Sequence, residues 1–352
     1  MAPQDVQSFK MMPPLANRFD FIRLMLAAGV FVYHGVAIGT AVPFGGAELA
    51  LAQLADISIQ GFFIVSGVLV AGSLDRASGL DDYAGKRIRR LYPAYAAVIL
   101  VPALISLLLT WDIGGVASYL GANLVFLNFL SPSLPGLFED NRFTAVNGAL
   151  WTLKIEVLFY LVLPLILFVL NRMKALWWVG IIALYLGGEL WAHFVPQLGP
   201  ELYGAELGRQ LPGQMAFFAM GIALWKASPG IQSRWRAMAL CGTALLGATF
   251  LHPALEPLRA FALAGVIGAV AWAPGPKLNV ARFGDVSYGL YITHFPILQA
   301  LAAAGLATSL GLAGFFALAT ALTLAASLAL WHLVEKPALR PSSHYRRVAA
   351  ET

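Results

Sequence analysis

The chain has 352 residues, of which 59% are hydrophobic and only 12% are charged, whereas about a quarter of the residues of a soluble globular protein are charged. This composition excludes a soluble enzyme, and a formal net charge of only +5 gives no indication of nucleic-acid binding. The single cysteine, Cys241, lies in an apolar run and implies neither a disulfide framework nor a thiolate metal site. The sequence therefore predicts an all-α, polytopic membrane protein without a metal.

Ten apolar segments predict a bundle of about ten transmembrane helices, each near the roughly 20 residues that a span needs. In chain order they are 20–40, 54–74, 91–111, 149–170, 175–195, 211–227, 237–252, 256–273, 284–305 and 309–334. A further run, 117–130, contains a glycine and two asparagines and is expected to be re-entrant or interfacial. The prediction divides the chain into a cytoplasmic N-terminal segment (1–19), a membrane-embedded domain (20–337) and a cytoplasmic tail (338–352).

The positions of the Lys and Arg residues predict the orientation. With a cytoplasmic N-terminus, 18 of the 23 Lys and Arg residues face the cytosol, three face outward and two, Arg23 and Lys154, fall within spans. This asymmetry follows the positive-inside rule, with both termini cytoplasmic. A full span at 117–130 would invert every later loop, so we reject that alternative.

The first span carries two polar residues, Arg23 and His34, although a cation in hydrocarbon costs roughly 2.5–3.5 kcal/mol. Eleven residues apart, they lie on nearly the same helix face, about 16 Å apart along the axis. Taken singly, Arg23 could reach the headgroups and His34 could bond to a neighbouring helix. Together they predict a polar seam that runs from the cytoplasmic surface toward the middle of the bilayer. Asp20, in the same segment, is a further candidate.

Two clusters follow the first spans. The loop 75–90 ends in four cations within five residues, and on a helix Arg87 and Arg90 would share a face suited to phosphates. The alternative is an ordinary positive-inside anchor. In ALWTLKIEVLFY (149–160), Lys154 and Glu156 interrupt a span but cannot face the same way, and an intramembrane carboxylate is a functional candidate.

The segment FGDVSYGLYITHFPI (283–297) places three polar residues, Ser287, Tyr291 and His294, on one stripe of a helix. They are candidates for catalysis, and the alternative is a set of hydrogen bonds between helices.

Five blocks of the sequence occur in one order: Arg23 followed by ten residues and His34, GFFIVSGVLVA (61–71), RIRRLYPAY (87–95), LWTLKIEVLFYLVLPL (150–165) and SYGLYITHFPI (287–297). In this order the chain resembles the membrane-bound family-three acyltransferases, which O-acylate bacterial surface glycans such as O-antigen, peptidoglycan and exopolysaccharide. The resemblance covers residues 18 to 337. Each block alone is a weak signal, but five in order are specific.

The resemblance implies roles for individual residues. His34 would be catalytic with Arg23 as its partner, and Arg87 and Arg90 would bind acyl-CoA. Glu156 would be the first glutamate of the family's Trp-to-Tyr block. Ser66, in the second of the five blocks, is a further candidate. The second glutamate of that block is replaced by Val157 here, and Lys154 stands where the family often has serine. Some members carry a soluble esterase-like domain. In its absence, either a separate partner would supply that step or the membrane domain would act alone.

The expected function is transfer of an acyl group, acetyl by family frequency, from cytosolic acyl-CoA to a sugar hydroxyl of a surface glycan or lipid-linked precursor. The enzyme would lie in the bacterial inner membrane, with His34 as the base and Glu156 as a carboxylate able to orient it. The alternative is a transporter or flippase that uses the polar seam as a substrate path. The donor discriminates between them, because a transporter should not consume acyl-CoA.

Overall fold

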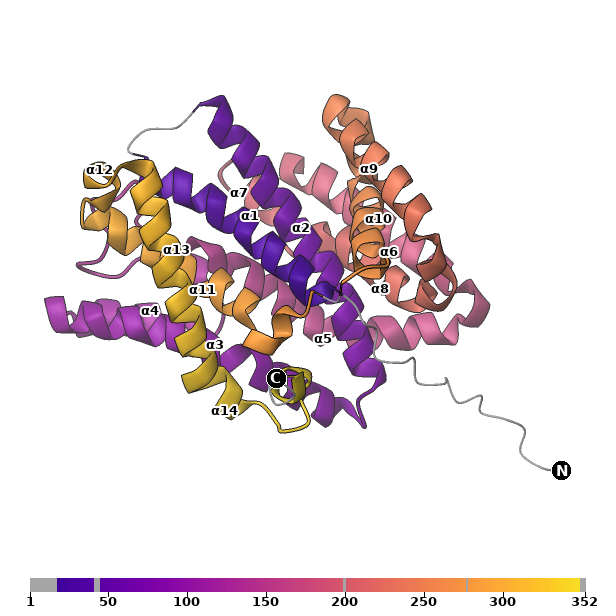
Figure 1. Ribbon diagram of the computed structural model, residues 1–352, viewed down its shortest axis with the longest axis horizontal. Coiled ribbons are helices and arrows are strands. Elements are labelled where there is room, and N and C mark those ends of the chain that lie inside the picture. The colour runs from indigo at the N-terminus through magenta and orange to yellow at the C-terminus, as the bar shows by residue number, and fades with distance from the viewer. Residues whose placement is uncertain (1–17, 41–44, 199–200, 277, 349–352) are drawn as a thin grey trace.

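The computed structural model describes residues 18–40, 45–198, 201–276 and 278–348, and within these ranges the elements are all helical (Figure 1). The α-helices are α1 (Phe19–Gly39), α2 (Gly46–Asp75), α3 (Leu80–Thr110), α4 (Ile113–Asn123), α5 (Trp151–Arg172), α6 (Trp177–Leu198), α7 (Glu201–Gly208), α8 (Leu211–Ile231), α9 (Trp235–Leu251), α10 (Arg259–Trp272), α11 (Val286–Ala303), α12 (Leu306–Ser309), α13 (Gly311–Leu330), α14 (Lys336–Ala338) and α15 (His344–Val348). Most of the predicted N-terminal segment, 1–17, and the end of the predicted tail, 349–352, lie outside the described residues.

Each predicted span coincides with a helix, and the all-α, multi-pass membrane architecture is confirmed. Seven helical segments of the described chain are long and apolar enough to cross a bilayer. They are α1, α2 and α3, then α5, α6 and α10, each with the turn before it, and α13 with the short helices after it. Because α8, α9 and α11 fall outside this set, the count of ten is not confirmed.

The helices pack around two apolar clusters of buried side chains. One cluster is built mainly from α2, α5, α8 and α10, and the other mainly from α1, α3, α11 and α13. Figure 1 shows the same division, with α6, α8, α9 and α10 on one side and α11, α12 and α13 on the other. Helix α2 packs against both α1 and α8, so it joins the two groups.

Close packing of α2 on α8 depends on two glycines. A Cβ atom at Gly221 would lie 2.1 Å from the carbonyl oxygen of Ile64, and one at Gly67 would lie 2.6 Å from the carbonyl oxygen of Phe218. Small residues let helix backbones approach in this way in membranes, where packing rather than water drives association. The two glycines therefore set the distance between α2 and α8.

Helices α2 and α3 begin earlier than the apolar pattern predicts. The segment 54–74 was expected to be helical and α2 starts at Gly46, while 91–111 was expected and α3 starts at Leu80. The added turns of α3 (80–90) carry six charged residues, so a hydropathy pattern does not detect them, whereas those of α2 (46–53) are mostly Ala and Leu and extend its apolar run. As a result, Arg87 and Arg90 lie on α3 itself.

The run 117–130 is not a spanning helix. Helix α4 has 11 residues, which at about 1.5 Å each cannot cross a hydrocarbon core of about 30 Å. The buried Asn123 donates to the carbonyl oxygens of Tyr119 and Ser131, at 2.9 and 2.8 Å, and accepts from Asn128 at 2.6 Å. Tyr95 of α3 donates to the Asn123 carbonyl oxygen at 2.7 Å, which ties this segment to α3. Whether it is re-entrant or interfacial stays a prediction.

Two groups of ion pairs lie at two ends of the bundle. At one end, the starts of α1, α3 and α11 meet the segment at α15. At the other, Arg142 binds Glu48 at 2.7 Å and the carbonyl oxygen of Ala37 at 3.0 Å, and its hydrogen bond to Glu48 raises the pKa of Arg142. Residues predicted to share a side of the membrane thus lie together, and the cytoplasmic placement of the first end remains a prediction.

Helix α11 lies between α1 and α13 and is buried along most of its length. Pro296, inside this helix, lacks an N–H, so the carbonyl oxygen of Ile292 has no helical partner. Asn147 donates to that oxygen at 2.8 Å. A helix surrounded by protein does not need an apolar exterior, which is why α11 tolerates the polar stripe of the sequence.

Candidate functional site

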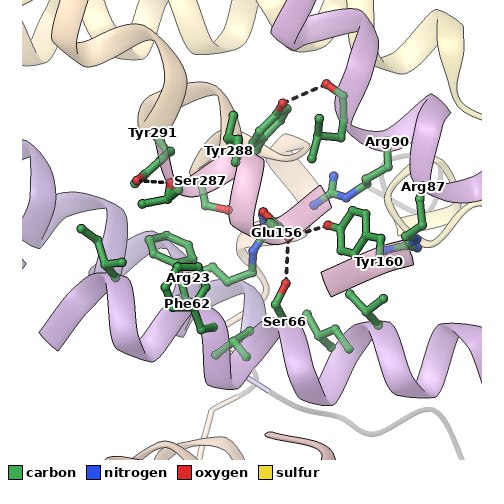
Figure 2. Close-up of a pocket in the computed structure, with 18 residues that line it drawn as sticks. Arg23, Phe62, Ser66, Arg87, Arg90, Glu156, Tyr160, Ser287, Tyr288 and Tyr291 are labelled. Atoms are coloured by element: carbon green, nitrogen blue, oxygen red, sulfur yellow. Dashed lines mark hydrogen bonds between the residues drawn. The ribbon is translucent and has the colours of Figure 1, made fainter. Parts of the chain in front are cut away.

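A cavity lies between α1, α2, α3, α5 and α11, and Figure 2 shows its lining. Seven of the residues selected from the sequence line it: Arg23, Ser66, Arg87, Arg90, Glu156, Ser287 and Tyr291. Five helices therefore bring these polar side chains to one place. His34, His294 and Asp20 do not line this cavity.

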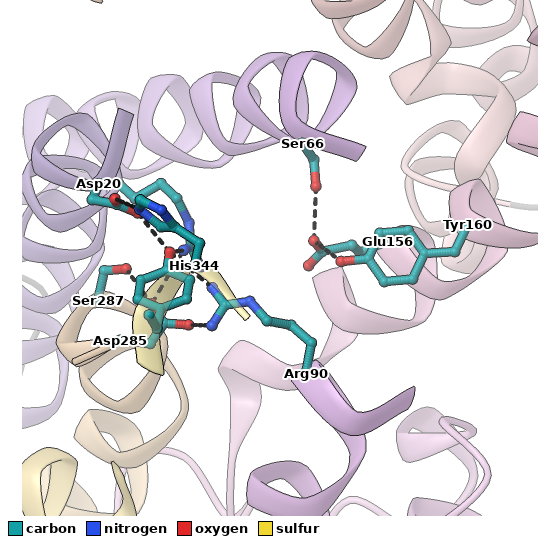
Figure 3. Close-up of polar contacts among 10 residues, drawn as sticks. Asp20, Ser66, Arg90, Glu156, Tyr160, Asp285, Ser287 and His344 are labelled. Atoms are coloured by element: carbon teal, nitrogen blue, oxygen red, sulfur yellow. Dashed lines mark hydrogen bonds and ion pairs between the residues drawn. The ribbon is translucent and has the colours of Figure 1, made fainter. Parts of the chain in front are cut away.

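Glu156 lies on the wall of the cavity with two hydroxyl partners. Its Oε1 accepts from Ser66 Oγ at 2.7 Å and from Tyr160 Oη at 2.5 Å (Figures 2 and 3). The sequence suggested that Glu156 orients His34, and this is wrong, because the carboxylate is bound to Ser66 and Tyr160 instead. Tyr160 follows Glu156 by one helical turn, which puts the two side chains on the same face of α5.

Asp285, at the N-terminal end of α11, forms ion pairs with two arginines, Arg23 and Arg90. Its carboxylate lies 3.1 Å from Arg23 Nη1, is paired with Arg90 on its second oxygen, and accepts from Ser287 Oγ at 3.1 Å (Figure 3). Asp285 is 1% exposed, so the ion pairs are desolvated. Arg23 is therefore held by Asp285, and its role as the catalytic partner of His34 stays a prediction. Arg23 is tolerated in its helix because α11 supplies a carboxylate at its N-terminal end.

Tyr345, from the end of the described chain, completes this cluster. Its hydroxyl accepts from Arg23 at 2.9 Å and from Arg90 at 3.2 Å, and donates to Asp20 at 2.5 Å. The Arg90 guanidinium lies 4.3 Å from the centre of the Tyr345 ring. Burial raises the pKa of Tyr345, so the phenol remains protonated and can donate to Asp20.

Arg87 has fewer polar partners than Arg90, which is paired with Asp285. It donates to Ser73 at 3.1 Å and lies 5.7 Å from the centre of the Tyr160 ring. No carboxylate within the described ranges pairs with it. Because a guanidinium has five N–H donors, Arg87 keeps donors for an anion that enters the cavity.

The predicted stripe on α11 divides between two environments. Ser287 and Tyr291 line the cavity, where Tyr291 Oη and Thr152 Oγ1 are 2.7 Å apart. His294 is fully buried, and its Nε2 lies 2.9 Å from Nδ1 of His34. The rings of Tyr291 and His294 are 6.1 Å apart, so Tyr291 stands between the cavity and the histidine pair.

Four residues of this arrangement were missed from the sequence: Thr152, Tyr160, Asp285 and Tyr345. Asp285 carried a usable signal, since it is an acid at the start of the predicted span 284–305, where a buried carboxylate needs a cationic partner. Tyr345 carried none. Within the described ranges, no group of three or more His, Cys, Asp or Glu side chains is arranged to hold a metal ion.

The fold and this cavity define a multi-pass membrane enzyme whose polar residues converge from several helices. The family model described as "Acyltransferase domain" matches residues 17–332, and the chain belongs to this family. It is therefore a membrane acyltransferase.

The relatives extend over nearly the whole chain. It is 27% identical to Nodulation protein 10 of Rhizobium leguminosarum bv. viciae, with 92% of this chain and 93% of that protein covered. It is 26% identical to an O-acetyl transferase of Shigella phage Sf6, with 93% and 97% covered. It is 29% identical to the exopolysaccharide production protein ExoZ of Rhizobium meliloti (strain 1021), with 82% and 90% covered. No solved structure matches.

Proposed function

We propose that this protein transfers an acyl group, acetyl by family frequency, from cytosolic acyl-CoA to a sugar hydroxyl of a surface glycan or of its lipid-linked precursor. Family membership supports acyl transfer, and relatives named as an O-acetyl transferase and an exopolysaccharide production protein support a glycan acceptor. The enzyme acts in the inner membrane with both termini in the cytosol. A separate soluble partner is needed only if the membrane domain does not complete the transfer.

The observation that carries the proposal is the cavity whose lining brings together three arginines, Arg23, Arg87 and Arg90, and the carboxylate of Glu156. Arginine binds phosphate through a planar fork of donors, and CoA carries phosphates at the end opposite its thioester. Arg87 supplies the donors that no carboxylate occupies. To reach His34, which is about 16 Å farther along α1 than Arg23 and does not line the cavity, the thioester arm passes Tyr291, which stands between the cavity and the histidine pair.

His34 is the base in this proposal. Its imidazole takes the proton of the acceptor hydroxyl as the hydroxyl oxygen forms a bond to the thioester carbonyl carbon. The carbon–sulfur bond then breaks, and the leaving CoA sulfur receives the proton from His34. The products are the acylated sugar and free CoA thiol, so neither a metal nor a redox partner is required.

A test of the whole function uses the surface glycan of a bacterium that lacks this gene. Mass spectrometry should show loss of an acyl group from the glycan, and its return with the wild-type gene. His34→Gln keeps a hydrogen-bonding end but cannot take a proton at neutral pH, so it should lower turnover by at least about a hundredfold. Glycan that is identical in the deletion strain would contradict the function, and near-normal acylation by His34→Gln would contradict the base.

Donor binding is tested separately with purified protein and acetyl-CoA. Arg87→Ala removes charge-assisted hydrogen bonds worth about 1.5–3 kcal/mol, so affinity should fall roughly ten- to a hundredfold. Arg87→Lys should be partly tolerated. The matched control is Arg89→Ala, since Arg89 lies in the same helix, does not line the cavity and donates to the carbonyl oxygen of Ala338. Unchanged affinity in Arg87→Ala would show that this cluster is only a membrane anchor, and acetyl-CoA bound but never consumed would favour the transporter.

A further inference from the structure

His34 and His294, beside the cavity, form a pair whose nearly parallel rings meet edge to edge. The rings of His34 and His294 have centroids 5.1 Å apart and an interplanar angle of 22°, and Nδ1 of His34 lies 2.9 Å from Nε2 of His294. The other ring nitrogen of His294, Nδ1, lies 3.1 Å from the carbonyl oxygen of Leu290, one turn earlier in α11. His294 therefore uses both of its nitrogens.

These contacts determine where the protons are. A carbonyl oxygen only accepts, so Nδ1 of His294 must carry the proton of that hydrogen bond. A second proton on His294 would make it a cation, and a fully buried cation without a paired carboxylate is disfavoured. No ion pair to His294 occurs within the described ranges. His294 is thus neutral, with a lone pair on Nε2.

The lone pair of His294 fixes the partner ring in turn. Since Nε2 of His294 can only accept, Nδ1 of His34 must be the donor, and His34 is the tautomer with its proton on Nδ1. Its Nε2 then carries the lone pair. Within the described residues no hydrogen bond to Nε2 of His34 occurs, and the side chain is only half-buried.

We propose that His294 is a positioning residue that holds His34 in the Nδ1–H tautomer and so presents Nε2 as the base. The inference rests on the proposed function in that His34 is taken as the base. Aromatic rings hold the pair in place: Phe31 meets His294 edge-on at 6.2 Å, and Phe295 meets His34 edge-on at 5.0 Å. When Nε2 of His34 takes the acceptor's proton, the Nδ1–H bond to His294 is kept, so no rearrangement accompanies the transfer.

The tautomer is measured directly by solid-state NMR on protein labelled with ¹⁵N-histidine in lipid bilayers. The His34 signals are identified by their loss in His34→Gln. In the wild type, Nδ1 of His34 should have the shift of a protonated nitrogen and Nε2 that of an unprotonated one. In His294→Phe, which keeps an aromatic ring but has no nitrogen, the Nδ1–H tautomer should no longer be enforced. A proton on Nε2 of His34 in the wild type, or an unchanged tautomer in His294→Phe, would overturn the inference.

Kinetics separate positioning from packing. His294→Phe should lower kcat at least about tenfold, as is typical when the residue that orients a reactive imidazole is lost, and leave the KM for acyl-CoA within a few-fold. His294→Gln, whose amide oxygen can accept from His34, should recover part of kcat. If packing were the whole role, Phe would preserve kcat and Gln would not. The wild-type spectrum tests the tautomer even if a variant fails to fold. If the spectrum shows the Nδ1–H tautomer of His34 but His34→Gln is active, His34 is not the base, and only the role of His294 in fixing the tautomer stands.

Discussion

Removing the carboxylate of Asp285 should destabilise the protein strongly. Asp285 is 1% exposed and is paired with two arginines, Arg23 and Arg90, whose side chains are 14% and 16% exposed. Asp285→Asn keeps the shape and one acceptor oxygen but removes the charge. The folded state then contains two neighbouring cations without the carboxylate that compensates both.

Breaking a buried ion pair from one side costs about 3–5 kcal/mol, because a buried charge remains. Asp20 and Arg23 share the hydroxyl of Tyr345 as a hydrogen-bond partner, so a second carboxylate remains close to the arginine. The asparagine oxygen also still accepts a hydrogen bond. The lower end of this range therefore applies. A loss of about 3 kcal/mol lowers the ratio of folded to unfolded protein more than a hundredfold.

Unfolding in mixed micelles, followed by tryptophan fluorescence as the denaturing detergent is increased, measures this loss. The control is Asp82→Asn, which breaks ion pairs of the same chemistry with Arg340 and Lys86 at the surface. Exposed pairs contribute little, so the control should change the unfolding free energy far less. Equal losses in the two variants would refute the reasoning.

Two further predictions concern packing and topology. Gly221→Ala should lower the unfolding free energy by roughly 1–3 kcal/mol because its Cβ would meet the backbone of α2. The control Gly247→Ala, where a Cβ meets open space, should leave the unfolding free energy unchanged or raise it by up to about 1 kcal/mol. Equal effects in a thermal unfolding assay would contradict the close contact. In a Cys241→Ser background, an impermeant maleimide applied to intact cells should label a cysteine at Ser133 and not one at Ser78, and the reverse pattern would require the opposite orientation.

The fold was predictable where the signal is local. Apolar runs located the helices, and the spacing of Arg87 and Arg90 placed both on one face, which does line the cavity. The stripe on α11 was visible too, because helical periodicity depends only on neighbouring residues. Hydropathy missed the charged first turns of α3 (80–90), since their residues gain nothing from burial in hydrocarbon.

Partners across the bundle could not be predicted, because periodicity gives the face of a helix but not what that face meets. Glu156 was expected to serve His34, yet Ser66 of α2 is its neighbour. His34 was expected to pair with a carboxylate, yet a second histidine approaches it. Both outcomes depend on the rotation of whole helices, which packing of the entire bundle sets.

The ion pair between Arg23 and Asp285 joins residues 262 positions apart in the sequence. At about 5–20 residues per second, the ribosome needs roughly 13–50 s to make the segment between them. Throughout that interval the first span holds an arginine whose counter-ion does not yet exist, so its charge must stay among the lipid headgroups. The ion pair at the start of the first helix therefore forms only after α11 is made, and the hydrogen bonds of Tyr345 form later still. The bundle is assembled from its first helix onward, but the end that holds Arg23, Asp285 and Tyr345 is the last part to be finished.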